Sequence, residues 1–282
     1  MADDDHAAAE LVETLTLDGV EQTFTIACFF DLDDSMTTRV KVFRKGPADH
    51  VSVSVPGFTT TVRGAMENMD TDGDNLRAQI EDQLQRAGRG SETVATVAWI
   101  GYDTPQVGDL KDGQISGAVA SSSDAQAGGN ALSSYLNGID ASRMDDPHLT
   151  ALGHSYGSTT LGYALQHGTG ADDAVFFGSP GLGTSDVNNL QVPDGHVYVE
   201  GAHWDPVAGL GRFGPEPGHL DGVTDLSTDT GTSPGGLPRA GVSGHTVYTT
   251  DGTMSQYNLA VVAGGMPQLA VHVVGSGAGG GS

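Results

Sequence analysis

Short apolar runs recur along the chain and predict a series of buried strands. Each run is rich in β-branched or aromatic residues and ends close to Gly, Pro or Asp, as strands commonly do. The later runs lack strict alternation of apolar and polar residues, which favours strands covered on both faces of a sheet. The predicted strands are TFTIACFF (23–30), TRVKVFR (38–44), HVSVSVPG (50–57), TVATVAWIG (93–101), HLTALG (148–153), AVFFGSPG (174–181) and HVYVEG (196–201).

Helical patterns lie between the later strands. In the clearest of them, Leu76, Ile80 and Leu84 recur at a spacing of four, and Gly88 is suited to end the helix. Alternating strands and helices indicate a mostly parallel sheet with helices on both faces. The first two strands leave no room for a helix between them, so they are expected to pair antiparallel. The predicted helices cover 73–88, 121–138, 158–168 and 255–265.

The segment from 208 to 244 is rich in Gly, Pro, Asp, Ser and Thr. It predicts a long loop with one short strand at 222–227, which would be the last strand of the sheet. A long loop inside a compact domain is more often functional than idle.

The segment LTALGHSYGSTTLG (149–162) places a serine between two glycines, where a strand is expected to end and a helix to begin. Gly153-His154-Ser155-Tyr156-Gly157 fits the G-x-S-x-G pattern of a nucleophile elbow, a tight and strained turn that exposes the serine Oγ at the edge of the sheet. We expect the residues two before and two after the serine to approach each other, which favours glycine at both. The alternative is an ordinary strand-to-helix turn, which a glycine-rich chain can produce by chance.

A serine nucleophile needs a base that a carboxylate orients. In this arrangement the order along the chain is Ser, then Asp or Glu, then His. Asp205 follows the strand after next, in GAHWDPVAG, and is the favoured acid. Glu200, within that strand, and Asp186, after the preceding strand, are the alternatives.

His245 is the favoured base, because it lies in a loop after the last predicted strand and just before the last predicted helix. His219, in PEPGHLDG, is the alternative. His272 lies in the apolar run QLAVHVVG and is interpreted as a structural residue. His154, beside the serine, is interpreted as a packing residue of the turn.

Two backbone N–H groups are expected to bind the oxyanion of a tetrahedral intermediate. One belongs to Tyr156, directly after the serine, and the other to Phe58 or Thr59, where Gly57 permits close approach of the backbone. The alternative for this second segment is a plain Gly-Pro turn followed by threonines. Candidate residues lining the substrate pocket are Phe58, Tyr102, Asp103 and Trp204, of which Tyr102 and Trp204 fit simple packing equally well.

The sequence predicts no metal site and no cofactor. The histidines lack the spacing of H-E-x-x-H, and Cys28 is the single cysteine, so neither a cysteine pair for a metal nor an intrachain disulfide is available. The stretch DTDGDN (70–75) resembles part of a calcium loop, but its glycine and distal glutamate are misplaced. It is interpreted as an Asp/Asn cluster that caps a helix.

Acidic residues outnumber basic ones by 36 to 12, giving a net charge of −24. Such a chain repels nucleic acid and anionic membranes, so neither is an expected partner. The opening MADDDHAAAE lacks the apolar centre of a secretory signal, and no apolar run is long enough to span a bilayer. We therefore expect a soluble, cytoplasmic protein, with export by another route and the oligomeric state left open.

Several segments together resemble a known family. HVSVSVPGFTTTV, VAWIGYDTP, LGHSYGSTTLG, DDAVFFGSPGLG, GHVYVEGAHWDPV and GHTVY follow one another as in the actinobacterial α/β-hydrolase family catalogued as domain of unknown function 1023. The resemblance spans roughly residues 45–265 and implies an α/β-hydrolase fold with a Ser-Asp-His triad, here Ser155, Asp205 and His245. The long loop at 208–244 and Trp204 depart from the family pattern, which leaves the shape of the pocket and the substrate open.

The expected organisation and function follow from the residue patterns together with this resemblance. The chain should comprise an N-terminal segment (1–45) whose antiparallel strands join the sheet, an α/β-hydrolase domain (46–274) and a flexible Gly/Ser tail (275–282). The expected function is a serine hydrolase that cleaves small carboxylic esters through an acyl-enzyme. The alternatives are an acyltransferase or peptidase with the same triad, and a non-catalytic binding or structural module of the same fold.

Overall fold

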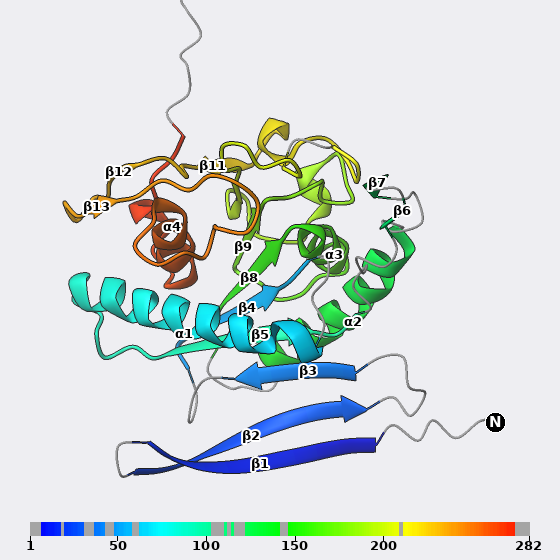
Figure 1. Cartoon of the computed structure of the whole chain (residues 1–282), viewed down its shortest axis with the longest axis vertical. Helices are drawn as coiled ribbons and strands as arrows, with labels where there is room; N and C mark the ends of the chain where they lie inside the picture. The colour runs from blue at the N-terminus through cyan, green and yellow to red at the C-terminus, as the bar shows by residue number, and fades with distance from the viewer. Residues whose placement is uncertain are drawn as a thin grey trace, which may run out of the picture.

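A nine-stranded sheet forms the centre of the computed structural model (Figure 1), in the order β1-β2-β3-β5-β4-β8-β9-β10-β11. The structure describes residues 7–17, 20–30, 37–42, 48–57, 62–102, 110–111, 114–115, 122–141, 146–208 and 211–273.

Six neighbouring strands of this sheet are parallel to one another. Successive side chains point to opposite faces, so that Phe176 packs into one apolar layer while Val175 and Phe177 pack into the other. Both faces are therefore covered, and the mostly parallel α/β fold predicted from the sequence is confirmed. The six strands are β5 (Val94–Ile100), β4 (His50–Val55), β8 (His148–His154), β9 (Asp173–Phe177), β10 (Val197–Glu200) and β11 (Thr224–Leu226).

Three antiparallel strands extend the sheet at one edge: β1 (Ala7–Leu17), β2 (Val20–Phe30) and β3 (Thr37–Val42). The antiparallel pairing of β2 with β3 was expected and is confirmed. Strand β1 was not predicted, because its alanines and glutamates have little intrinsic preference for strands. It pairs with β2 along its whole length, so the partner strand rather than local preference accounts for it.

Two pairs of helices cover the faces of the sheet (Figure 1). The apolar layer on one face contains side chains of α2 (Ser122–Ala141) and α3 (Tyr156–Leu165). The layer on the other face contains side chains of α1 (Val62–Arg86) and α4 (Met254–Ala263). Helices on both faces were predicted, and α2, α3 and α4 lie close to their expected positions.

Helix α1 begins at Val62, well before the predicted start at residue 73. The DTDGDN stretch therefore lies inside the helix, and its interpretation as a helix cap was wrong. Gly and Asp are poor helix formers, so packing must sustain the helix there. Thr96 of β5 donates a hydrogen bond to the Gly73 carbonyl (3.1 Å), and Leu76 and Ile80 are buried against the sheet. The helix ends as expected near Gly88, whose φ is +76°.

The described part of the segment, 208 and 211–244, is mostly loop, as predicted, and β11 lies within the expected strand at 222–227. No helix among the described parts of the chain is long and apolar enough to cross a bilayer. The division into an N-terminal segment, a hydrolase domain and a tail stays a prediction. The remaining short elements are the strand pairs β6 (Leu110–Lys111) with β7 (Gln114–Ile115) and β12 (Gly231–Thr232) with β13 (Pro238–Arg239), and single helical turns at Val187–Asn189, Pro217–His219 and Pro267–Leu269.

Two helical glycines provide a matched test of how tightly α3 is packed. A Cβ on Gly162 of α3 would lie 2.0 Å from the carbonyl oxygen of Leu182, whereas a Cβ on Gly138 of α2 would meet nothing within 4 Å. We expect Gly162→Ala to lower the free energy of unfolding by about 1–3 kcal/mol or more through overpacking. Gly138→Ala should raise it by about 0.5 kcal/mol through helix propensity. Urea denaturation of both variants tests this, and equal effects would contradict it.

Candidate active site

Ser155 lies at the sharp bend between β8 and α3. Its φ of 54° and ψ of −132° place a non-glycine residue in a strained conformation, which persists only where the surroundings fix it. Its N–H donates to the carbonyl of Phe177 on the neighbouring strand β9 (3.0 Å), and the residue is only 5% exposed. The bend thus holds the serine at the carboxyl end of β8, between strand and helix.

Three glycines make room for this bend. A Cβ on Gly57 would lie 2.5 Å from the Cβ of Ser155, so the backbone after β4 lies directly against the serine. A Cβ on Gly157 would lie 2.3 Å from a carbonyl oxygen of β4, and one on Gly153 would lie 2.8 Å from the Cα of Ser158. These contacts leave room only for glycine at positions 153 and 157, as predicted. The close approach of these two residues to each other stays a prediction.

The structure joins three of the predicted side chains in one hydrogen-bonded chain. His245 Nε2 lies 2.8 Å from Ser155 Oγ. On the other side of the same ring, Nδ1 lies 2.9 Å from Asp205 Oδ1 and 3.0 Å from Oδ2. Because a carboxylate only accepts, Nδ1 carries the donated proton and Nε2 faces the serine hydroxyl as an acceptor.

Asp205 is held as a carboxylate although its side chain is fully buried. Burial alone would raise its pKa, but hydrogen bonds from His245, from Tyr248 and from the backbone N–H of Val207 outweigh burial and lower the pKa to about 2. Oδ1 also accepts the N–H of Ala208 (3.2 Å), within the turn that follows the acid. The turn that follows Asp205 thus supplies donors that stabilise the charge.

Tyr248 and Gly178 belong to this constellation, and neither was predicted. The Tyr248 hydroxyl donates to Asp205 Oδ2 (2.6 Å) and accepts the N–H of Ala202 (2.9 Å). Burial, followed by the nearby Asp205 charge, raises the Tyr248 pKa, so the hydroxyl keeps its proton. A Cβ on Gly178, whose φ is +58°, would lie 3.0 Å from Asp205 Oδ2 and 3.2 Å from His245 Cε1. The sequence signal for Tyr248 was its position three residues after His245, in GHTVY.

His154 packs beneath the base, as its interpretation from the sequence required. Its ring stacks on Phe177 at 5.1 Å between centroids and lies 4.8 Å from the His245 ring. Its Nε2 donates to the carbonyl oxygen of His245 (2.8 Å), which fixes the loop that carries the base. Burial lowers the pKa of His154 to about 4, so this ring is neutral around pH 7.

The alternatives to the favoured acid lie in other environments. Glu200 is buried within β10, accepts a hydrogen bond from Ser255, and has no partner for Oε1 among the described residues. Burial raises its pKa well above 4.5, which favours the protonated form. Asp186 instead caps the turn at Val187–Asn189 by accepting the N–H of Asn188 (2.9 Å).

His219, the alternative to the favoured base, and His272, interpreted from the sequence as a structural residue, are both exposed. His219 has a side chain 77% exposed and lies 3.6 Å from Glu216. His272 is exposed at a single bridge to Leu226. Neither takes part in the hydrogen-bonded chain that contains Ser155.

The structure describes some of the remaining predicted site residues and not others. Tyr156 is the first residue of α3 and therefore lies at the positive end of the helix dipole. Phe58, Thr59 and Asp103 lie outside the described residues. Tyr102 is buried, donates its hydroxyl proton to the Pro56 carbonyl (2.6 Å) and stacks on Tyr156, so it packs rather than lines an open cavity.

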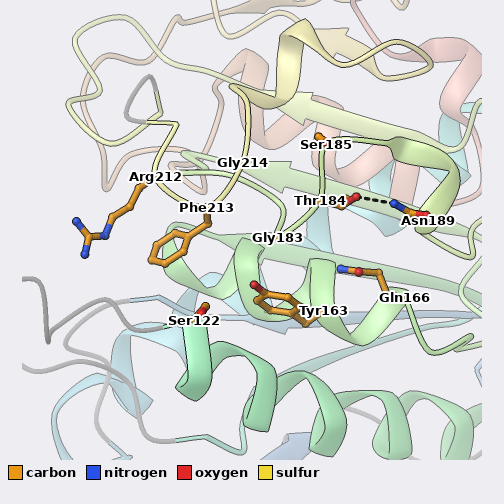
Figure 2. Close-up of a pocket in the computed structure, with 10 residues that line it drawn as sticks. All are labelled: Ser122, Tyr163, Gln166, Gly183, Thr184, Ser185, Asn189, Arg212, Phe213 and Gly214. Atoms are coloured by element: carbon orange, nitrogen blue, oxygen red, sulfur yellow. Dashed lines mark hydrogen bonds between the residues drawn. The ribbon is translucent and has the colours of Figure 1, made fainter.

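A hollow of about 820 Å³ lies along α3 on the side of α2 (Figure 2). Figure 2 shows Phe213 above Ser122 and Tyr163 in this view, with Arg212 extending away from them. Phe213 also meets the ring of Tyr156 edge to face at 5.5 Å, so the hollow adjoins the residue after the serine. The lining is completed by Gln166, Gly183, Thr184, Ser185, Asn189 and Gly214.

Among the described residues, no group of three or more His, Cys, Asp and Glu side chains is arranged to hold a metal ion. At the opposite ends of the strands, Asp173 lies 2.9 Å from His148 Nε2 and 2.7 Å from His196 Nδ1.

The class of protein follows from where the serine lies in the sheet. A strained serine between the end of a central parallel strand and the start of a helix, facing a histidine from late in the chain, is the arrangement of α/β hydrolases. The chain belongs to the alpha/beta hydrolase family, whose model matches residues 33–215. At this level of description the protein is a hydrolase.

Its relatives include uncharacterized mycobacterial proteins. The uncharacterized protein Rv0963c of Mycobacterium tuberculosis is 35% identical over 196 residues, which are 67% of this chain and 71% of that protein. The uncharacterized protein Rv2079 of the same species is 34% identical over 199 residues, which are 67% of this chain but only 29% of that protein. Family membership predicted from the sequence is thus confirmed for the alpha/beta hydrolases, while the narrower resemblance to domain of unknown function 1023 stays a prediction.

Two solved structures of similar architecture are hydrolases. The dienelactone hydrolase of Anabaena variabilis is 12% identical, with 95% of this chain and 100% of that chain covered and a TM-score of 0.45. A cold-adapted esterase from an Arctic intertidal metagenomic library is 12% identical, with 96% and 100% covered and a TM-score of 0.44. Similarities of this size support no inference about activity.

Replacing Glu200 tests how a buried carboxyl group affects the stability of the fold at different pH values. Because burial raises its pKa above 4.5, the folded state retains a proton that the unfolded state releases. Its contribution to stability is present at lower pH and is lost as pH rises above about 4.5. We expect the free energy of unfolding of Glu200→Gln, minus that of the wild type, to increase between pH 5 and pH 8. Urea denaturation across this range measures it, and a difference that does not change with pH would contradict it.

Proposed function

We propose that the protein is a serine hydrolase that cleaves carboxylic esters through a covalent acyl-enzyme. The observation that supports this most is the hydrogen-bonded chain from Asp205 through His245 to Ser155. Opposite nitrogens of one imidazole face a buried carboxylate and a serine hydroxyl, which is the geometry that activates a weak nucleophile.

In the proposed reaction, His245 Nε2 accepts the hydroxyl proton while Ser155 Oγ forms a bond to the ester carbonyl carbon. The carbonyl π electrons move to the oxygen, giving a tetrahedral oxyanion. Asp205 stabilises the charged imidazole. His245 then gives the proton to the alcohol oxygen as the carbon–oxygen bond to the alcohol breaks. Water, deprotonated by the same ring, attacks the acyl-enzyme and releases the acid and the serine.

We propose that the backbone N–H groups of Tyr156 and Phe58 bind the oxyanion. Tyr156 starts α3, where the helix dipole favours negative charge. Phe58 follows Gly57, whose backbone lies against Ser155. Donors from these two positions would converge near the atom that the serine attacks.

The proposed substrate is a small-molecule ester without strong negative charge. The chain carries a net charge of −24, which opposes the approach of polyanions. A cytoplasmic location stays a prediction.

Replacing the nucleophile tests the proposed function directly. We expect Ser155→Ala to lower kcat on p-nitrophenyl esters by at least about a thousandfold, because the covalent step is lost. The wild type should label with a fluorophosphonate probe, and Ser155→Ala should not. Ser134→Ala, at an exposed serine of α2, is the matched control and should keep both activities. A series from acetate to palmitate would also define the preferred acyl length.

Replacing His245 tests its proposed role as the base, and replacing His219 is the matched control. His245→Ala should lose turnover, whereas His219→Ala, at the exposed alternative, should retain it. A folded wild type that neither labels nor turns over any ester would favour a non-catalytic module of the same fold.

Tyr248→Phe tests whether the proposed role of Asp205 depends on the hydrogen bond that it accepts from the Tyr248 hydroxyl. The change removes the 2.6 Å hydrogen bond to Asp205 Oδ2, one of the donors that hold the pKa of that carboxyl low, so its pKa rises and it orients His245 less firmly. We expect the acidic limb of the kcat/KM profile to move to higher pH and kcat to fall about tenfold. Tyr257→Phe is the control, because that hydroxyl bonds the Leu269 carbonyl away from the acid. An unchanged pH profile and kcat would contradict the role of Tyr248.

A further inference from the structure

Trp204 combines two features that are individually unfavourable. It is 90% exposed, and its φ is +57°. It occupies the third position of a turn closed by the Asp205 N–H and the Ala202 carbonyl (3.2 Å), where a positive φ is normally supplied by glycine. Among the described residues, every other positive φ belongs to glycine or to Ser155.

Nothing within the described protein compensates for these costs. The strain at Ser155 is explained by the bend that aims its hydroxyl, but an exposed indole gains little from packing in the folded state. Glycine would fit this turn better, and the chain uses glycine freely elsewhere. Strain at a large exposed side chain beside a reactive group points to a function for that side chain.

The position of Trp204 indicates which part of a substrate it would meet. It directly precedes Asp205, and the preceding His203 carbonyl accepts hydrogen bonds from the Gly244 N–H (2.8 Å) and the Ser243 hydroxyl (3.0 Å). The turn is thereby attached to the loop that carries His245. In the proposed reaction this histidine protonates the departing alcohol, so the leaving group is the part of the substrate nearest to the loop that the Trp204 turn contacts.

The surroundings narrow the class of ligand. The side chains of His203 and Asp229 are exposed and lie 3.2 Å apart, and the chain is strongly acidic, so an anionic surface is an unfavourable partner. An indole face offers a large apolar contact area.

We propose that Trp204 is a specificity-determining residue that binds the apolar alcohol portion of an uncharged ester. This inference rests on the proposed function, since it takes its side of the site from the role of His245. It states that the protein prefers esters of apolar alcohols, and that a contact on the indole supplies this preference.

Two substrate series test the proposal by kinetics. One contains acetates of methyl, butyl and hexyl alcohol, and the other contains methyl esters of acetic, butyric and hexanoic acid. For Trp204→Gly we expect KM for hexyl acetate to rise about tenfold, as for loss of a tryptophan anchor, while kcat and the whole methyl-ester series stay unchanged. His203→Ala, at the exposed neighbour, is the control and should leave both series unchanged. Equal losses in both series, a loss confined to the acyl series, or no loss would each overturn the proposal.

Folding and binding are measured separately. Trp204→Gly should have a Tm at or above that of the wild type, because glycine relieves the strained turn. In Ser155→Ala, hexyl acetate should reduce acrylamide quenching of tryptophan fluorescence, whereas methyl acetate should not. Trp99, the other tryptophan, is 1% exposed, so the quenchable emission comes from Trp204. If hexyl acetate gives no protection from quenching, the inference about Trp204 is overturned, whether or not the wild type hydrolyses any ester. If protection is seen but the wild type shows no turnover that depends on Ser155, only the proposed function is overturned.

Discussion

The strained bend at Ser155 is the constraint on which the rest of the site depends. A side chain there needs a left-handed backbone, and the surrounding elements must hold it in place. Hydrogen bonding to β9 and the close approach of Gly57 and Gly157 provide that support. Any Cβ at those glycines would collide with atoms of the bend or of β4, so the packing of β4, β8 and α3 fixes the position of Ser155.

Charge near the site is controlled by donors rather than by burial alone. Asp205 and Glu200 are both buried near the end of β10, yet their pKa values move in opposite directions. Asp205 accepts hydrogen bonds from an imidazole, a tyrosine hydroxyl and two backbone N–H groups, which together overcome desolvation. Glu200 has one hydroxyl partner and stays protonated. The number of donors therefore distinguishes a carboxylate that can orient a histidine from one that cannot.

Ser155 and Trp204 are the two strained non-glycine residues among the described positions. Ser155 precedes α3 and forms one end of the hydrogen-bonded chain, and Trp204 directly precedes Asp205 at its other end. Strain is retained where the folded protein needs a side chain in an otherwise unfavourable position. For the serine that need is explained by the proposed chemistry, and for the tryptophan by the proposed contact with substrate.

The sequence by itself determined the elements whose signals are local. Apolar runs marked the parallel strands, glycine spacing marked the bend at Ser155, and chain order indicated Asp205 and His245. It did not determine β1, which owes its conformation to pairing with β2, or the early start of α1, where packing on β5 sustains poor helix formers. Nor did it reveal Tyr248 and Gly178 around the acid, or the exposure and backbone strain of Trp204. Local preferences are encoded by neighbours along the chain, whereas these features arise between segments far apart in sequence, so only the tertiary structure decided them.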